Sequence, residues 1–295
     1  MKAALLADRG VVKVAGDGAR DYLHGLVTVD ILALAPGAAR FCALLTPQGK
    51  IIADFIVTEA PAADGGFFLD IPRAAGAALI GKLNLYKLRA KVLIEDLSET
   101  LGVLAAWDGN GSTKIGLTYT DPRLPALGMR VMLPPHLAAA ATAELGAEPA
   151  DPSQYEAHRI ALGVPQGGTD FSYGDAFPHE SDMDQLGGVD FAKGCYIGQE
   201  VVSRMQHRGT ARTRAVPVRY DGAAPQAGAA VTAGERQLGT IGSAAAGRAV
   251  ALLRLDRVTE AMARGEPLTA GGTPIHLVKP DWAHFAFPGE SEAAE

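Results

Sequence analysis

The chain has 295 residues and a net charge of −6, from 27 Lys and Arg against 33 Asp and Glu. Its two cysteines, Cys42 and Cys195, exclude a disulfide-stapled secreted domain and a zinc or iron–sulfur site held by four cysteines of this chain. The composition, 48% hydrophobic and 20% charged, predicts a globular protein of about two structural units.

Charge and hydropathy also limit the partners that we expect. The acidic balance argues against nucleic acid, and no apolar run approaches the ~18 residues of a membrane span. The apolar run Ala3–Ala7 is too short for the core of a signal peptide. We therefore expect a cytoplasmic protein without a membrane or nucleic-acid partner.

The first half of the chain alternates short apolar runs with turns, a pattern typical of α+β folds. Strands are expected at Val11–Ala15, Phe41–Leu45, Lys50–Thr58, Phe67–Ile71, Arg89–Glu95 and Leu101–Ala106. Thr46–Gly49 reads as the turn of a hairpin. Helices are expected from an Asp17 cap to Gly25, over Ala74–Leu85, over Ala138–Leu145, and from an Asp151 cap to Gly163.

The second half has a different texture. Gly163–Gly209 is glycine-rich with little periodicity and predicts packed loop and short helix. The runs Arg214–Tyr220, Arg236–Ala244 and Arg248–Leu255 indicate a small β-barrel or sandwich. We expect a body over 1–209, a barrel over 210–285 and a disordered tail over 286–295.

The most distinctive stretch begins Lys193-Gly194-Cys195 and continues Tyr196-Ile197-Gly198-Gln199-Glu200. Its two glycines allow a tight backbone path around the cysteine. Lys193 and Arg204 would stabilise a thiolate at Cys195. The alternative is a buried structural cysteine, the commoner fate of a free thiol.

This stretch resembles the signature of the YgfZ family, which is related to the T-protein of the glycine cleavage system and includes the mitochondrial iron–sulfur assembly factor. The matching positions are Lys193, Gly194, Cys195, Tyr196, Gly198, Gln199, Glu200 and Arg204. Tyr22–Asp30, Leu44–Lys50, Tyr86–Arg89 and Gly187–Val189 also fit the family. The resemblance implies an α+β, T-protein-like body around a central cavity, followed by a C-terminal β-barrel.

The resemblance further implies tetrahydrofolate as a ligand. Glu180 matches the T-protein position that contacts the pterin, and a carboxylate can accept two hydrogen bonds from such a ring. Tyr155 and Arg9 occupy positions where relatives place aromatic folate contacts, although Arg9 is not aromatic. Arg208 lies in a basic run suited to an anionic tail, together with Arg204, Arg212 and Arg214. The alternatives are an exposed loop glutamate at Glu180 and a solvated face for the run, above all at Arg212 and Arg214.

Asp54 is the candidate for a catalytic carboxylate. The T-protein has an Asp-Asp pair on a strand, and the matching segment Ile52–Phe55 keeps only one acid. Alternation along the strand puts Ile52, Asp54 and Ile56 on one face. Either that face lines a wet cavity, or Asp54 pairs with a base such as Lys50.

These observations support three functions. The first is an iron–sulfur cluster assembly or repair factor that acts on client iron–sulfur proteins or cluster-assembly proteins. Cys195 would then be a redox-active or transient ligand thiol, with no metal held stably. The second is a folate-dependent aminomethyl or one-carbon transferase that uses Asp54. The third is an interaction adaptor that uses the basic run.

Overall fold

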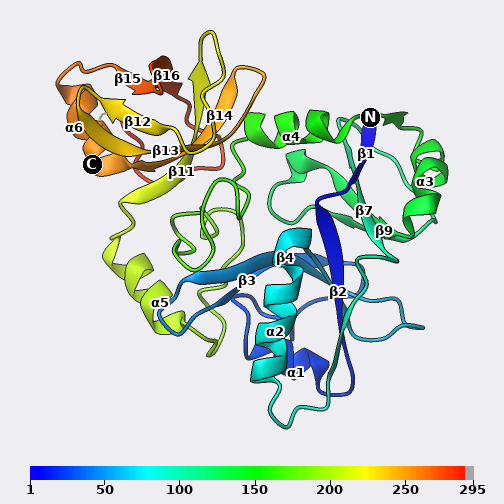
Figure 1. The fold of residues 1–295 in the computed structure, drawn as a ribbon. Helices are drawn as coiled ribbons and strands as arrows, with labels where there is room; N and C mark the ends of the chain where they lie inside the picture. The colour runs from blue at the N-terminus through cyan, green and yellow to red at the C-terminus, as the bar shows by residue number, and fades with distance from the viewer. Residues whose placement is uncertain (290–295) are drawn as a thin grey trace. The chain divides into compact units, whose positions relative to one another are not determined.

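The computed structural model describes residues 1–289. Figure 1 shows the elements along the chain, which divides into two compact units. Unit 1 comprises Met1–Tyr155 and Leu186–Ser203, and unit 2 comprises Glu156–Gln185 and the chain from Arg204 onward. Two helices, α4 (Pro152–Ala161) and α5 (Gln199–Arg208), contribute residues to both units.

Unit 1 contains two five-stranded sheets. The first has the order β3 (Ala39–Leu45), β4 (Ile51–Glu59), β5 (Phe67–Pro72), β2 (Arg9–Ala15) and β6 (Leu93–Asp96), and all its pairs are antiparallel. The second has the order β10 (Glu148–Pro149), β1 (Lys2–Leu6), β7 (Gly102–Trp107), β9 (Met129–Leu133) and β8 (Leu117–Thr120). In this sheet β1 and β10 are parallel and the other pairs are antiparallel.

Short helices cover these sheets. They are α1 (Ala19–His24), η1 (Arg73–Ala75), α2 (Gly76–Tyr86), η2 (Pro125–Leu127), η3 (Pro135–Leu137) and α3 (Ala138–Glu144). α2 packs on β2, β4 and β6 and buries Leu79 and Leu83 completely. α3 joins an apolar cluster with β1, β7 and β9, which includes Leu104, Val131 and Leu145. Each sheet therefore has its own apolar covering.

Unit 2 is built around a closed barrel with the order β11-β14-β13-β12-β15-β16. Its strands are β11 (Thr213–Tyr220), β12 (Ala230–Ala233), β13 (Arg236–Ala245), β14 (Arg248–Arg254), β15 (Leu268–Ala270) and β16 (Thr273–Leu277). α6 (Leu255–Ala263) buries Leu255, Val258 and Ala261 in the barrel core. Closure removes the exposed edges that an open sheet of such short strands would leave.

Most predicted elements are present, but some differ from the prediction and others were not predicted. The hairpin of β3 and β4 forms as expected. The helix after Asp151 also begins as expected, because Asp151 Oδ1 accepts the Ser153 N–H at 2.9 Å. Asp17 does not cap α1, whose N-cap is Gly18 without a side-chain bond. β6 begins at Leu93 rather than at residue 89, because a turn precedes it. The sequence pattern did not indicate α6 or seven of the strands, namely β1, β8, β9, β10, β12, β15 and β16.

The predicted disordered tail needs a correction at its start. Phe287 is 8% exposed and belongs to the barrel core, because its ring packs with the apolar side chains there. The rest of that prediction, over 290–295, lies outside the described residues. Among residues 1–289 no helix has the length and apolar character needed to cross a bilayer.

Candidate functional site

Cys195 is exposed, whereas its neighbours in the chain are anchored in unit 1. Lys193 is 7% exposed and donates three hydrogen bonds from Nζ. The acceptors are the carbonyl oxygens of His24 at 2.6 Å, Val27 at 2.7 Å and Val29 at 3.0 Å. An ammonium has three donors, so all of them are committed to the turn that follows α1.

This arrangement corrects the predicted role of Lys193. Its ammonium holds the Cys195 segment to residues 24–29 instead of pairing with the thiol. Burial lowers the pKa of Lys193, and Cys42, Asp30 and Asp190 act in the opposite direction. Lys193 therefore anchors the signature segment and presents the cysteine two residues further along.

Tyr196 and Gly198 fix the other side of the cysteine. Tyr196 is buried, and burial raises the pKa of its hydroxyl to about 12. Gly198 has φ +82°, and a Cβ there would lie 2.6 Å from the Thr46 carbonyl oxygen and 3.0 Å from Gly49 Cα. Only glycine fits this contact with the β3–β4 turn. The signature thus packs on the turn that the sequence predicted at Thr46–Gly49.

The signature then enters α5. Gln199 begins the helix, and Glu200 lies in its first turn, where a carboxylate is favourable. Gly194 and Glu200 are exposed, so the segment around the thiol is open to solvent within unit 1. Arg204 lies further along α5, in the part that belongs to unit 2, and is also exposed.

Cys42 has the opposite environment. It is fully buried in β3, and burial raises the pKa of its thiol, with a further rise from Asp54 and an opposing effect of Lys193. A raised pKa suppresses the thiolate, which is the reactive form. Of the two cysteines, Cys195 is therefore the one available to a metal or a partner.

Asp54 is 6% exposed in β4, opposite Ala43 of β3. The charge of Asp54 raises the pKa of the Cys42 thiol, so the Asp54 carboxylate acts on this buried side chain of the neighbouring strand. The predicted alternatives for Asp54, a cavity wall or a paired carboxylate, remain predictions.

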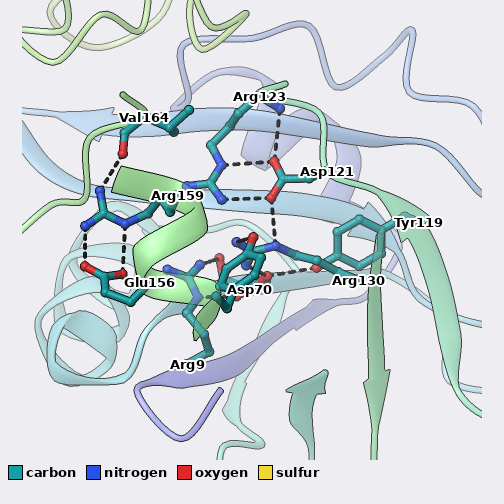
Figure 2. A network of polar contacts seen from close by, with 10 residues as sticks. Arg9, Asp70, Tyr119, Asp121, Arg123, Arg130, Glu156, Arg159 and Val164 are labelled. Carbon is teal, nitrogen blue, oxygen red and sulfur yellow. Dashed lines mark hydrogen bonds and ion pairs between the residues drawn. The ribbon is translucent and has the colours of Figure 1, made fainter. Parts of the chain in front are cut away.

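Arg9 and Tyr155, two of the predicted folate contacts, belong to one buried polar network in unit 1. Figure 2 shows Arg9 of this network together with Asp70 and Arg130. Arg9 Nε donates to Asp70 Oδ1 at 2.6 Å and its NH2 donates to the Asp70 carbonyl at 2.7 Å. Arg130 NH1 donates to Asp70 Oδ2 at 2.5 Å, and Arg130 NH2 lies 3.4 Å from the Tyr155 hydroxyl. The Tyr155 ring packs edge-on to Trp107 at 5.3 Å and is only 4% exposed.

The network extends through a second carboxylate. Asp121 accepts from Arg130 Nε at 2.9 Å and from Arg123 Nε and NH2 at 3.0 and 2.7 Å. Tyr119 donates its hydroxyl to Asp70 Oδ2 at 2.9 Å. We call Arg9, Asp70, Tyr119, Asp121, Arg123 and Arg130 the arginine-rich cluster, since it holds three guanidinium groups and two carboxylates.

Burial alone would raise the pKa of Asp70, but Arg130 and Arg9 outweigh it and hold the pKa below its usual range. Asp121 has the same balance with Arg123 and Arg130, and its pKa is also lowered. Both carboxylates are therefore ionised at neutral pH. The sequence did not reveal this cluster, although Asp70 within the apolar run Phe67–Ile71 was a signal comparable to Asp54.

Glu180, the predicted pterin contact, lies in unit 2. Its Oε2 accepts the Phe177 N–H at 2.9 Å, so one carboxylate oxygen is committed to the local turn. Its backbone carbonyl accepts the Ala215 N–H at 2.9 Å, which ties the loop to β11. Glu180 is also one of the residues that line a cavity of about 210 Å³ within this unit.

The predicted basic run divides in two. Arg204, Arg208 and Arg212 are exposed. Arg214 is 6% exposed, which corrects its assignment to a solvated face. Its NH1 and NH2 donate to Asp184 Oδ1 and Oδ2 at 2.6 and 2.9 Å, because the strand turns this side chain inward onto two carboxylates.

Asp182 is the second carboxylate at Arg214. It is fully buried, has φ +57°, and its Oδ1 lies 3.2 Å from Arg214 NH1. Its Oδ2 has no hydrogen-bond partner among the described residues. Burial raises the pKa of Asp182 well above its usual value, because Arg214 compensates only in part and Asp184 adds to the rise. We call Asp182, Asp184 and Arg214 the aspartate-rich cluster.

The residues present fit tetrahydrofolate only in part. Glu180 keeps one carboxylate oxygen for a ligand, and Arg208 is exposed. Arg9 is instead engaged in the arginine-rich cluster, and the Tyr155 hydroxyl lies beside Arg130 of that cluster; both side chains are buried. Over residues 1–289 no group of three or more His, Cys, Asp or Glu side chains is arranged to hold a metal ion.

Comparison with known proteins places these features in context. Residues 212–285 match the family described as CAF17, C-terminal beta-barrel domain. The chain is 32% identical over 245 residues to the iron-sulfur cluster assembly factor IBA57, mitochondrial, of Homo sapiens, covering 76% of this chain and 67% of that protein. It is 35% identical over 232 residues to the IBA57 homolog of Mycosarcoma maydis, covering 74% of this chain and 57% of that protein.

A structural comparison confirms the predicted fold. The glycine cleavage system aminomethyltransferase T of Bartonella henselae superposes with a TM-score of 0.74 at 15% identity. The match covers 97% of this chain and 87% of that one. The α+β, T-protein-like fold and the closed C-terminal barrel are therefore both as expected from the sequence.

The relatives also correct one expectation and limit another. The predicted cytoplasmic location is wrong, because the matching IBA57 proteins are mitochondrial by name. The chain spans 57% of the length of the Mycosarcoma maydis protein and 67% of the human one, so these relatives contain sequence that this alignment does not cover.

Proposed function

The chain belongs to the IBA57 family of iron–sulfur cluster assembly factors, and we propose that it assists cluster assembly by presenting Cys195 as a single thiolate ligand. One observation carries this proposal. The exposed Cys195 lies on a segment that Lys193, Tyr196 and Gly198 anchor to unit 1, whereas Cys42 is fully buried.

The number of thiols defines what this residue does in assembly. A usual iron–sulfur cluster takes four cysteine ligands, and this chain offers one accessible thiol. Cys195 therefore completes the coordination of a cluster whose other ligands come from a client iron–sulfur protein or a cluster-assembly protein. Binding releases the thiol proton to solvent, because the thiolate is the ligand.

The anchoring of the Cys195 segment also favours cluster binding. A ligand already held in place loses less conformational entropy when it binds. Lys193 and Gly198 fix the backbone two residues before and three residues after the thiol, so the cluster carrier meets a preorganised ligand. We also propose that this chain is a YgfZ-type protein, because it matches that family's signature at eight positions.

Tetrahydrofolate is the small-molecule ligand that we propose for the same protein. The fold shared with an aminomethyltransferase and the uncommitted oxygen of Glu180 support it. Calorimetric titration with tetrahydrofolate tests this ligand, and Glu180→Gln is expected to weaken binding by about tenfold, the effect of one lost charged hydrogen bond. Absence of heat with the wild-type chain would remove folate from the proposal without touching Cys195.

Oxygen-free cluster transfer tests the role of the thiol. Glutathione-ligated cluster would be added to the wild type, Cys195→Ser and Cys42→Ala, and bound cluster followed by visible circular dichroism. We expect the wild type and Cys42→Ala to gain the signal and Cys195→Ser to lose at least about 90% of it, because a hydroxyl is a poor ligand for this soft metal site.

Folding provides the control for this experiment. Cys195 is exposed, so Cys195→Ser should change the free energy of unfolding by less than about 0.5 kcal/mol. Cluster binding by Cys195→Ser equal to that of the wild type would overturn the proposal.

A further inference from the structure

α2 ends in a segment with several exposed leucines. Leu85 is 63% exposed, Leu88 is 90% exposed and Leu93 is 53% exposed. The helix has already buried Leu79 and Leu83 against its sheet. The three exposed leucines are therefore additional to the core, and together they leave apolar surface in contact with water. A local concentration of this kind is typical of an interaction site.

The same segment is strongly basic. Residues 71–94 contain no Asp or Glu, although the whole chain has a net charge of −6. Lys82, Lys87, Arg89 and Lys91 lie among the exposed leucines. Within residues 1–289 none of these four side chains makes a hydrogen bond or ion pair. Arg9, Arg130 and Arg214 differ from them, since each is held by a carboxylate.

The backbone holds the segment in a compact turn. Ala90 N donates to the Lys87 carbonyl at 2.7 Å, and Val92 N donates to the Ala90 carbonyl at 3.0 Å. Leu88 has φ +44°, a conformation that residues other than glycine rarely adopt, and Val92 is buried at 5% exposure. The turn follows α2 in Figure 1 and leads to β6. A strained backbone that displays a leucine indicates a role for that side chain outside the fold.

We propose that residues 82–93, the basic tip, are a docking surface for a partner protein that contacts it through an acidic segment carrying apolar side chains. Carboxylates of the partner would pair with the four free cations, and its apolar side chains would cover the three leucines. The proposal is independent of the chemistry at Cys195.

Other anionic surfaces fit these features less well. A membrane-surface helix needs an exposed apolar face, but the apolar face of α2 is buried and the leucines extend into a turn and a strand. Nucleic acid would use the cations, yet leaves the leucines without a partner. A protein segment satisfies both the charge and the apolar surface.

Hydrogen bonds connect both the basic tip and the signature segment to α1. The Tyr22 hydroxyl of α1 donates to the Leu83 carbonyl in α2. The His24 carbonyl, at the end of α1, accepts from Lys193. A partner docked on the basic tip would therefore contact an element that is mechanically connected to the Cys195 segment through α1.

Photo-crosslinking in cells that make the full chain tests the proposal. A photoreactive amino acid would replace Leu85, and a matched one would replace Leu32, which is 52% exposed elsewhere in unit 1. Mass spectrometry would identify both the adduct and the attached peptide. We expect a discrete adduct from position 85 only, attached to an acid-rich segment of an identified protein.

Two variants address charge and apolar contact separately. Arg89→Glu/Lys91→Glu should reduce the adduct by at least about tenfold, since like charges replace complementary ones. Leu88→Asn should reduce it as well, and asparagine tolerates the left-handed backbone there. The control Arg40→Glu/Lys114→Glu makes the same change in net charge at exposed positions of unit 1 and should leave the adduct unchanged.

Several outcomes would overturn the proposal. They are equal crosslinking from positions 85 and 32, an adduct with lipid or nucleic acid, and insensitivity to Arg89→Glu/Lys91→Glu. Co-sedimentation with vesicles containing phosphatidylglycerol, if lost in that charge-reversal variant, would assign the surface to membranes instead.

Discussion

The two units bury ionic clusters of opposite balance. The arginine-rich cluster of unit 1 has three guanidinium groups for two carboxylates, whereas the aspartate-rich cluster of unit 2 has two carboxylates for one guanidinium. Asp70 accepts from two arginines and a tyrosine, but Asp182 has a carboxylate oxygen without a hydrogen-bond partner among the described residues.

The difference shows in the direction of the pKa shifts. Burial raises the pKa of every carboxyl group, whereas each nearby arginine lowers it, so the number of nearby arginines decides the direction of the net shift. Two arginines hold the pKa of Asp70 below its usual range. Arg214 contacts both Asp182 and Asp184, and its charge is not enough to bring the raised pKa of Asp182 down to its usual value. The two clusters should therefore respond to pH with opposite signs.

The largest effect is expected from Asp70→Asn. Loss of the central carboxylate leaves Arg9 buried without its counter-charge and leaves Arg130 with Asp121, which Arg123 also uses. Breaking a buried pair in this way typically costs about 3–5 kcal/mol. Urea unfolding at pH 7 measures this change. As a control, Glu99→Gln removes the 91% exposed partner of Arg73 and should cost less than about 1 kcal/mol.

The pH dependence sharpens this first prediction. The folded-state pKa of Asp70 lies below the unfolded value of 3.8, so its stabilisation is complete above that value and is lost as pH falls through the folded pKa. The difference between wild type and Asp70→Asn should therefore shrink in acid. A difference that stays constant down to pH 3 would contradict the ionised state of Asp70.

An intermediate effect is expected from Lys193→Met. Lys193 is a buried cation whose three hydrogen bonds go to carbonyls and whose Nζ also lies 5.3 Å from the centroid of the Tyr196 ring, so it tests whether a buried charge in unit 1 needs a carboxylate. Three carbonyls lose their donor, while removal of the buried ammonium returns part of the cost, giving a loss of about 1–2 kcal/mol. Urea unfolding and hydrogen exchange in residues 24–29 measure it.

Lys82→Met is the matched control for this variant. Lys82 is exposed and makes no hydrogen bond or ion pair within residues 1–289, so its replacement should be close to neutral. If Lys193→Met matched Lys82→Met in both stability and exchange, the anchoring role of Lys193 would be wrong.

The sequence predicted the fold further than the contacts of the site. Local patterns were sufficient for the β3–β4 hairpin, the Asp151 cap and the signature around Cys195, because each depends on residues close in the chain. The carbonyls that bind Lys193 lie 164 to 169 residues away, and Arg9 and Asp70 are 61 apart. No local spacing encodes such pairs.

The sequence also could not predict which single charged residues are buried. Arg214 follows Arg204, Arg208 and Arg212 at similar spacing, and nothing in that run marks it as the buried member. Its partners Asp182 and Asp184 decide this, since they lie 32 and 30 residues away in the chain and meet its guanidinium only in the fold.

The smallest effect, and one of opposite sign, is expected from Asp182→Asn. The raised folded-state pKa means that the wild type loses stability as pH rises from the unfolded value of 3.8 through the folded pKa. Asparagine keeps an acceptor for Arg214, tolerates φ +57° and removes the buried charge, so the variant should be more stable at pH 7 by about 1 kcal/mol, the low end of the cost of an unsatisfied buried polar group. Urea unfolding between pH 4 and pH 8 should show this gain vanishing towards pH 4, the reverse of the trend for Asp70→Asn. Destabilisation at every pH would mean that Asp182 is an ionised partner that Arg214 requires, and the two clusters would then follow the same rule.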